Sequence, residues 1–434
     1  MADGPPPEAR VITIATAFVG CKVSQADSEE ALGALRGAGL HAVARGDGAD
    51  LVVVHTCCVT AEAERKSRRL VHRMAADGRR VVVAGCAATL RPQQFEGPGV
   101  ELLGERPWAA LAAESDAPAG APPARASGAL SAASPSGEHR RTRVVVKVQD
   151  GCGGRCSYCA VRLVRGLPRS RPLAEVVETA EGAIARGCGE IVLSGIDLGS
   201  WRDGGRRLAD LVATLTASAA FAPRGRAGRL RLSSLEPRHL DDRLLEALAH
   251  PSVARHLHVP LQSADDGVLA AMGRPYAFAD YEAILTRVRA RLGRAMLSTD
   301  VIVGFPTEGE AAFRRTEAAL ESGLFGRVHV FAYSSRPGTA AAQLPPLPAA
   351  VVKERRGRAL AAAEAAARAA RRAAVGRPAE VLVEECRDGL GRGYSSEYVR
   401  TFVRGAVRPG QLVSVVADGE HEDGVIGTVK EPRA

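Results

Sequence analysis

The sequence predicts an α/β protein in three parts: an N-terminal parallel α/β domain, a central (β/α)6 partial barrel and a small C-terminal antiparallel β-barrel. Strand-sized apolar runs alternate with helical stretches up to about residue 331, which is typical of parallel sheets with helical crossovers. Short β-like segments joined by glycine-containing turns follow residue 376. Between these parts, residues 113–141 are rich in Ala, Pro, Ser and Gly without periodicity, which predicts a flexible linker.

Composition narrows the class of protein. The chain has 434 residues, of which 46% are hydrophobic, and a net charge of +9, which is compatible with a polyanionic partner. Residues 1–10 are polar and proline-rich and do not resemble a signal peptide, and the longest apolar runs are strand-sized. We therefore expect a cytoplasmic protein without membrane association. In a reducing compartment, the nine cysteines indicate metal binding or catalysis more than disulfides.

The N-terminal domain, residues 9–112, contains three predicted buried strands at 11–18, 49–55 and 80–84, with helices expected at 24–36 and 61–76. Cys21, Cys57 and Cys86 follow the ends of these strands. Because ligands bind beyond the carboxyl ends of parallel strands, the three cysteines are predicted to face one crevice as a metal site. Cys58 is an alternative to Cys57, and buried cysteines can also be simple core residues.

The central domain, residues 142–348, is predicted to contain six strands alternating with helices. The strands are expected at 144–148, 190–193, 229–232, 256–259, 297–303 and 327–331. The helices between them include 173–185, 208–217, 242–249, 278–291 and 310–321. Right-handed crossovers would curl such a sheet into a partial barrel, with functional residues on the loops after its strands.

One loop of this domain carries a cysteine motif. Cys152, Cys156 and Cys159 have the spacing C-x3-C-x2-C directly after the first predicted strand. Three thiolates can bind three corners of a [4Fe–4S] cluster and leave one iron open to another ligand. A structural zinc site usually has four ligands, and a disulfide needs an oxidising compartment, so both alternatives are weaker.

The motif, with Tyr158 before its last cysteine, resembles the radical S-adenosylmethionine (SAM) enzymes. The longer string Gln149-Asp150-Gly151-Cys152 resembles one branch of them, the methylthiotransferases. Further strings resemble the methylthiotransferase motifs and occur in the same order along the chain. They begin at Gly20-Cys21-Lys22-Val23, Thr56-Cys57, Gly85-Cys86, Leu232-Ser233-Ser234-Leu235-Glu236-Pro237, His256-Leu257-His258 and Thr299-Asp300. Ser24 and His55 depart from that family's usual asparagines, and Arg162-Leu163 replaces its common proline–tyrosine pair.

The resemblance implies two [4Fe–4S] clusters and SAM. Cys152, Cys156 and Cys159 would be the catalytic cluster's ligands, and Cys21, Cys57 and Cys86 would hold an auxiliary cluster. Tyr158, Ser234, Glu236 and Gly304 would lie at the SAM site. Arg162, Arg165, Arg169 and Arg171 form a basic run beside the cysteine loop, for which we expect RNA contact, although a solvated loop is the alternative.

The C-terminal part begins with a basic connecting helix, predicted within residues 349–375. Residues 376–434 follow, with β-like segments expected at 379–384, 398–403, 412–416 and 424–428. These residues resemble a TRAM domain, which in this family helps to hold tRNA. Cys188 and Cys386 are expected to be structural. His256 and His258 are as compatible with packing as with function.

Of the family's branches, the motifs most resemble enzymes that methylthiolate carbon 2 of N6-threonylcarbamoyladenosine at tRNA position 37. The isopentenyladenosine tRNA branch and the ribosomal-protein aspartate branch are the alternatives. A non-enzymatic RNA-binding or electron-transfer protein with two clusters is an alternative of another class. The expected partners are tRNA and a low-potential electron donor, and the enzyme is expected to be a monomer.

Overall fold

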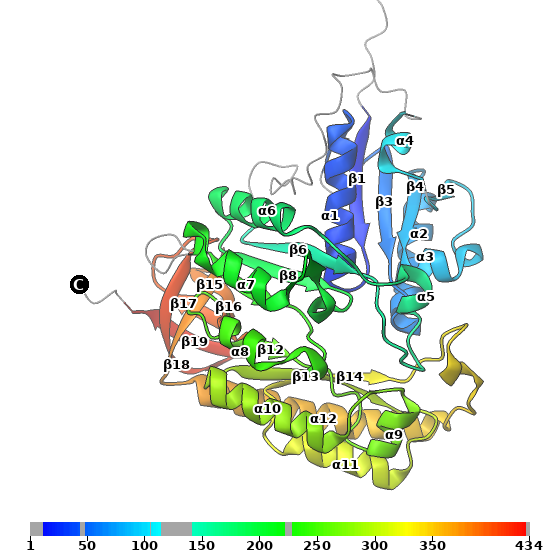
Figure 1. Ribbon diagram of the computed structural model, residues 1–434. Coiled ribbons are helices and arrows are strands. Elements are labelled where there is room, and N and C mark those ends of the chain that lie inside the picture. Colours follow the sequence, from blue (N-terminus) through cyan, green and yellow to red (C-terminus); the bar gives the residue numbers. More distant parts are fainter. Residues whose placement is uncertain (1–11, 44–47, 105, 114–140, 222–227, 431–434) are drawn as a thin grey trace, which may run out of the picture. The chain divides into compact units, whose positions relative to one another are not determined.

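The computed structural model describes residues 12–43, 48–104, 106–113, 141–221 and 228–430 (Figure 1). The chain divides into two compact units, residues 1–140 and 141–434, which are described separately below. Nearly all of the predicted linker lies outside the described residues. None of the helices in the described ranges is long and apolar enough to cross a membrane.

Unit 1 contains a five-stranded parallel sheet with the strand order β2-β1-β3-β4-β5. The strands are β1 (Thr13–Phe18), β2 (His41–Ala42), β3 (Leu51–Thr56), β4 (Arg80–Gly85) and β5 (Val100–Leu102). All six residues of β3 are buried, as expected for the central strand of a sheet covered on both faces. Because β1, β3 and β4 are neighbours, their carboxyl ends lie side by side at one edge of the sheet.

The helices of unit 1 are α1 (Lys22–Gly37), α2 (Ala61–Ala76), α3 (Cys86–Leu90) and α4 (Trp108–Ala113). Thr60 caps α2, because its side chain accepts a hydrogen bond from the backbone N–H of Ala63. Glu62 and Glu64 in the first turn complement the positive end of the helix dipole. These local signals explain why the predicted bounds of α2 agree with the structure.

Unit 2 contains six parallel strands whose order in space follows the chain. They are β6 (Arg143–Asp150), β8 (Glu190–Gly195), β11 (Arg229–Leu232), β12 (His256–His258), β13 (Met296–Val303) and β14 (Arg327–Ala332). Regular parallel pairing joins β6 to β8 and β8 to β11, and it also joins β12 to β13 and β13 to β14. Isolated parallel bridges connect β11 with the segment around β12. The predicted partial barrel is therefore confirmed.

Helices cover the outer face of this barrel. They are α6 (Leu173–Ala185), α7 (Leu208–Ala217), α8 (Asp242–Leu248), α10 (Phe278–Leu292), α11 (Glu310–Glu321) and α12 (Ala349–Ala374). The short helices α5 (Val161–Arg165) and α9 (Asp266–Ala271) lie in the segments that follow β6 and β12. In α10, the buried residues are Tyr281, Leu285, Val288 and Leu292, whose spacing forms a single apolar stripe. Helices α10, α11 and α12 lie along the side of the barrel formed by β13 and β14 (Figure 1).

The C-terminal part is a closed five-stranded barrel with the order β15-β16-β17-β19-β18. Its strands are β15 (Pro378–Arg387), β16 (Leu390–Ser395), β17 (Arg400–Arg404), β18 (Leu412–His421) and β19 (Gly424–Val429). The pairs are antiparallel, as predicted, except that β17 and β19 run parallel. The prediction missed β16, whose Gly393 allows the neighbouring strand to approach: an added Cβ would lie 1.7 Å from the Leu382 carbonyl oxygen.

A buried ion cluster joins the C-terminal barrel to the partial barrel at the start of strands β8 and β11. Glu190 is fully buried and binds the guanidinium groups of Arg229 and Arg231, with N–O distances of 2.6 and 3.0 Å. Arg229 also donates to the Glu380 carbonyl oxygen at 3.0 Å, and Arg231 donates to that of Ser395 at 3.1 Å. Burial by itself would raise the pKa of Glu190, but the adjacent arginines hold it well below its usual range.

Candidate iron–sulfur and SAM site

The loop after β6 presents the three predicted cluster ligands. Cys152, Cys156 and Cys159 are half-buried between the end of β6 and the start of α5, and no disulfide joins cysteines in the described ranges. The chain turns sharply at Gly151, which has φ of 72°, and a Cβ there would lie 2.1 Å from the Leu167 carbonyl oxygen. Glycine is therefore required where the cysteine loop leaves the strand.

Polar side chains hold the base of this loop. The buried Gln149 accepts a hydrogen bond from the Asp197 backbone N–H at 2.8 Å, and its amide donates to the Gly151 carbonyl oxygen at 2.7 Å. Arg165 pairs with Asp150 at 3.1 Å, and Asp150 accepts from the Gly151 N–H at 2.8 Å. The Arg165 guanidinium is thus engaged inside the loop, and the predicted RNA contact of the basic run stays a prediction.

The space between the first two thiols suits a cluster. A Cβ on Gly154 would lie 3.2 Å from the Cys152 Sγ and 3.9 Å from the Cys156 Sγ, so glycine leaves this cradle open. The Gly154 backbone N–H donates to the Cys152 Sγ at 3.2 Å, a contact that stabilises a thiolate. Both features fit the binding of iron by these sulfurs.

Burial raises the pKa of the Cys152 and Cys159 thiols in the protein without metal. Desolvation raises the pKa of Cys152, and the hydrogen bond from Gly154 offsets part of that effect. Desolvation raises the pKa of Cys159 to about 11, against a smaller lowering by the Val161 N–H. Metal binding must therefore release protons from these sites.

A second segment clamps the cysteine loop from the side. The Ser157 N–H donates to the Met272 carbonyl oxygen at 2.9 Å, and the Ser157 hydroxyl donates to that of Ala271 at 2.7 Å. At Gly273, where φ is 71°, a Cβ would lie 2.8 Å from the Arg155 carbonyl oxygen. The turn after α9 thus packs directly on the backbone between the first two cysteines of the motif.

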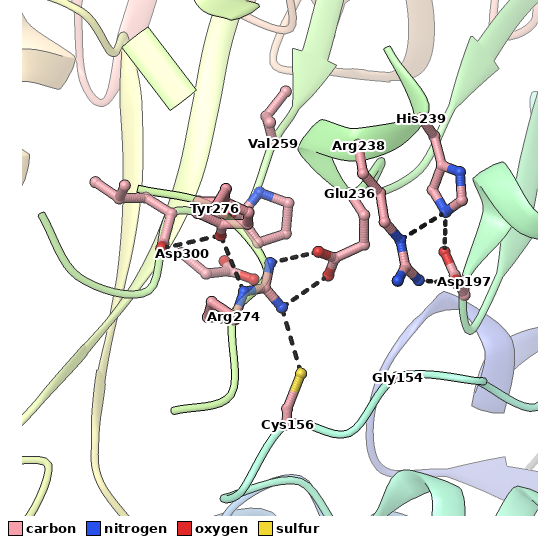
Figure 2. A network of polar contacts seen from close by, with 12 residues as sticks. Gly154, Cys156, Asp197, Glu236, Arg238, His239, Val259, Arg274, Tyr276 and Asp300 are labelled. Atoms are coloured by element: carbon pink, nitrogen blue, oxygen red, sulfur yellow. Dashed lines mark hydrogen bonds and ion pairs between the residues drawn. The ribbon is translucent and has the colours of Figure 1, made fainter. Parts of the chain in front are cut away.

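The same turn brings Arg274 to the site (Figure 2). Its guanidinium donates to the Cys156 Sγ at 3.5 Å, to the Tyr276 hydroxyl at 2.9 Å, and through both terminal nitrogens to Glu236. The Arg274 side chain is only 3% exposed. Although burial opposes its charge, the carboxylate of Glu236 raises the pKa of Arg274 further above its usual value. Glu236 was expected at the site from the sequence, whereas Arg274 and Tyr276 were not, because no local motif marks them.

Asp197, which the sequence analysis also missed, follows β8 on the other side of the network (Figure 2). It binds Arg238 Nη2 at 2.7 Å and His239 Nε2 at 2.9 Å. Burial by itself would raise the pKa of Asp197, but these two partners outweigh burial and lower it. The carboxylate therefore stays ionised above the ends of β8 and β11.

The remaining predicted SAM residues lie at the carboxyl ends of the strands. Ser234 is exposed and forms a bridge to His258 beyond the end of β11. Tyr158 packs against a core cluster that includes Met272 and Phe305. Gly304 follows β13, and a Cβ there would lie 2.7 Å from the Val352 side chain. The absence of a side chain at Gly304 is therefore explained by the approach of α12.

In unit 1, the three predicted auxiliary ligands lie at the shared edge of the sheet. Cys21 is exposed and precedes α1, Cys57 is buried after β3, and Cys86 begins α3 after β4. A Cβ on Gly20 would lie 3.1 Å from the Cys57 Sγ, and that sulfur accepts from the Val59 N–H at 3.5 Å. The turn before Cys21 thus contacts Cys57, which supports Cys57 over Cys58 as the predicted ligand.

The two remaining cysteines differ in their surroundings. Cys188 is buried and its thiol donates to the Glu190 carbonyl oxygen at 3.1 Å, which agrees with a structural role. Cys386 is exposed, and its thiol lies 3.4 Å from the Val407 carbonyl oxygen. Neither lies in the cysteine loop after β6.

A parallel partial barrel with three half-buried thiols beyond its first strand defines an enzyme of the radical SAM class. Comparison agrees: residues 146–320 match the Radical SAM superfamily, and residues 13–101 match the family described as "Uncharacterized protein family UPF0004". The radical SAM methyltransferase TsrM from Kitasatospora setae, solved with cobalamin and a [4Fe–4S] cluster, has a similar fold. Its TM-score is 0.56 at 17% identity, covering 76% of this chain and 77% of that one.

Full-length relatives narrow the class. The chain is 32% identical to the Threonylcarbamoyladenosine tRNA methylthiotransferase MtaB of Thermotoga maritima, over 95% of this chain and 96% of that protein. It is 34% identical to the tRNA-2-methylthio-N(6)-dimethylallyladenosine synthase of Chloroflexus aurantiacus, over 92% of this chain and 87% of that protein. The chain therefore belongs to the radical SAM methylthiotransferases, enzymes that use SAM and [4Fe–4S] clusters and transfer a sulfur-containing group.

Proposed function

We propose that this enzyme transfers a methylthio group to carbon 2 of N6-threonylcarbamoyladenosine at position 37 of tRNA. The observation that carries this choice is the match to the Thermotoga maritima threonylcarbamoyladenosine enzyme, which covers almost the whole of both chains. The match to a dimethylallyladenosine synthase is of similar identity but leaves more of that protein uncovered. The isopentenyladenosine branch is therefore the second candidate, and the ribosomal-protein aspartate branch is the third.

Two cysteine triads would hold the metal clusters of this reaction. Cys152, Cys156 and Cys159 would bind the cluster that, when loaded with SAM, supplies radical chemistry. Cys21, Cys57 and Cys86 would bind the auxiliary cluster, from which the sulfur would come. A low-potential electron donor would deliver the reducing electron, and the enzyme would act as a cytoplasmic monomer.

The chain's own residues position these groups. Gln149 and Asp150 fix the backbone at the base of the cysteine loop, and Arg274 directs a positive charge at the Cys156 sulfur. Glu236 is held by Arg274 at the edge of the site, where its carboxylate would face SAM. Packing of the half-buried Tyr158 on the core cluster around α9 would exclude water from that side of the loop.

The tRNA backbone would contact exposed cations near the cysteine loop. Arg162 and Arg169 are exposed on either side of the Gly166 turn, which leaves them available to phosphates.

The basic helix α12 offers fewer cations to tRNA than its composition indicates. Arg355 is buried on Glu308 at 2.8 Å, and Arg358 is engaged by Glu317 and by Glu310 at 3.0 Å. The role of α12 is thus mainly to support β14 and α11.

The proposal is tested with the anaerobically reconstituted enzyme, SAM, a reductant and two purified tRNAs. One tRNA carries N6-threonylcarbamoyladenosine at position 37, and the other carries N6-isopentenyladenosine. Nucleoside mass spectrometry should detect the methylthio derivative only in the first. Methylthiolation of the second tRNA alone would move the enzyme to the isopentenyladenosine branch. SAM cleavage without modification of either tRNA would contradict a tRNA substrate, and no SAM cleavage would favour an electron-transfer protein.

A further inference from the structure

A cluster of metal-ligating side chains, none of them a cysteine, lies inside the partial barrel. His258, Asp300 and His329 come from three adjacent strands, β12, β13 and β14. Asp300 is directly opposite His329 in the register of β13 and β14. The hydroxyl of Thr299, on the opposite face of β13, lies 3.4 Å from the Tyr281 hydroxyl of the outer helix α10. Because side chains alternate along a strand, Asp300 points away from that helix and into the barrel.

The distances suit a shared metal ion. One ligand atom from each of the three residues lies within 4.8 Å of the others. The His258 Nε2 and Asp300 Oδ2 are 3.1 Å apart. Two ligands that each lie ~2.0 Å from a tetrahedral zinc ion are ~3.3 Å apart, so this pair is already at the separation that a common ion requires. The His329 imidazole would complete the set, since its ring centre lies 5.6 Å from that of His258.

A second layer of contacts orients the first ligand. The Ser298 hydroxyl lies 2.9 Å from the His258 Nδ1 and 2.8 Å from the His256 Nε2. Metal-binding imidazoles characteristically use their other nitrogen in such a hydrogen bond, which fixes the tautomer. With its Nδ1–H donated to Ser298, His258 would direct the Nε2 lone pair toward Asp300, an arrangement that a cation between them stabilises.

We propose that His258, Asp300 and His329 bind a divalent transition-metal ion of the zinc class. Two imidazoles and one carboxylate are preferred ligands of zinc and ferrous iron, and three protein ligands leave a position for water or another oxygen ligand. The side chains of His258 and Asp300 are 12% and 25% exposed, so they are mostly buried but still accessible to an ion from solvent. The ion would tie together the three strands whose carboxyl ends carry Ser263, Gly304 and Tyr333.

The test measures zinc and iron together in the full-length, anaerobically reconstituted enzyme. After dialysis against zinc and then against metal-free buffer, mass spectrometry of the elements should find about one zinc ion per chain beside the cluster iron. His258→Ala and His329→Ala should each lower retained zinc at least tenfold with iron unchanged. His72→Ala, which removes an exposed histidine of unit 1, should retain zinc like the wild type.

Equal zinc content in the wild type and in His329→Ala, or no retained zinc in the wild type, would overturn the proposal. X-ray absorption at the zinc edge of the wild type gives an answer that does not depend on the variants. Only nitrogen and oxygen neighbours are expected. Sulfur neighbours would assign the zinc to cysteines instead and would also overturn the proposal. Since zinc is measured without turnover, failure here is separate from failure of the proposed tRNA activity.

Discussion

The guanidinium of Arg274 donates a hydrogen bond to the sulfur of Cys156 at 3.5 Å, from a turn that lies on the other half of the partial barrel. The same guanidinium is held by Glu236 and Tyr276, so its position is fixed before any cofactor binds. Hydrogen bonds and charge near the sulfurs of a cluster adjust its reduction potential. Arg274 is therefore placed to influence the electron uptake on which SAM cleavage depends.

Replacement of this cation should make the catalytic cluster harder to reduce. We expect Arg274→Gln to lower the midpoint potential by on the order of 60 mV, which is a tenfold change for a one-electron couple. Potentiometric titration followed by electron paramagnetic resonance measures this value. Arg291→Gln, which removes an exposed arginine of α10, is the matched control. An unchanged potential in Arg274→Gln would show that the contact is only structural.

Gly154 should be intolerant of a side chain because of the two sulfurs beside it. In Gly154→Ala the new methyl group would lie 3.2 Å from the Cys152 Sγ, within the volume that a cluster needs. Iron and sulfide analysis should show roughly half of the wild-type cluster content, since only this triad is affected. Gly153→Ala is the control, because its Cβ would meet only Pro168, at 3.7 Å. Normal iron content in Gly154→Ala would show that cluster binding does not need the space left by Gly154.

The buried carboxylate of Glu190 should be essential for attachment of the C-terminal barrel. Glu190→Gln removes the carboxylate that Arg229 and Arg231 share and leaves Arg229 only the more distant Glu380, at 3.7 Å. Breaking a buried ion pair typically costs about 3–5 kcal/mol. Hydrogen exchange should therefore show lower protection in β15 and β16. Glu385→Gln, at an exposed site, should leave protection unchanged. Equal protection in both variants would mean that packing alone holds the barrel in place.

The raised pKa of Cys159 predicts how the alkylation rate of this thiol depends on pH. A thiol with a pKa of about 11 is mostly protonated at neutral pH, and only the thiolate is alkylated. In cluster-free protein, the logarithm of the alkylation rate at Cys159 should therefore keep rising up to pH 10, with a slope of about one. Peptide mass spectrometry after timed iodoacetamide treatment measures the rate. A plateau near pH 9 would indicate a thiol with an ordinary pKa.

Much of the fold could be predicted because its signals are local. The bounds of α2 follow from its Thr60 cap, and those of α6 and α7 follow from apolar periodicity. Each cysteine of the two triads follows a strand, as expected. Strand β16 could not be found in this way, since Gly391 and Gly393 weaken its β pattern. Those glycines serve close packing inside the barrel, which becomes visible only when the barrel has closed.

The network around the candidate site was less predictable for a related reason. Arg274 and Asp197 act through partners that come from other strands and loops, so nothing in their own sequence neighbourhoods distinguishes them. The basic residues show the reverse problem. Arg165 looks like part of an exposed basic run in the sequence, but in the structure it pairs with the carboxylate of Asp150. Contacts between distant segments thus decide which charged residues remain available for function.

The most direct test of the central claim is nucleoside analysis of tRNA from a strain that lacks this gene. The account predicts loss of 2-methylthio-N6-threonylcarbamoyladenosine alone, with accumulation of the unmethylthiolated nucleoside. Complementation with the wild type should restore the mark, and Cys152→Ala should not. Unchanged tRNA nucleosides in the deletion strain would contradict the assignment.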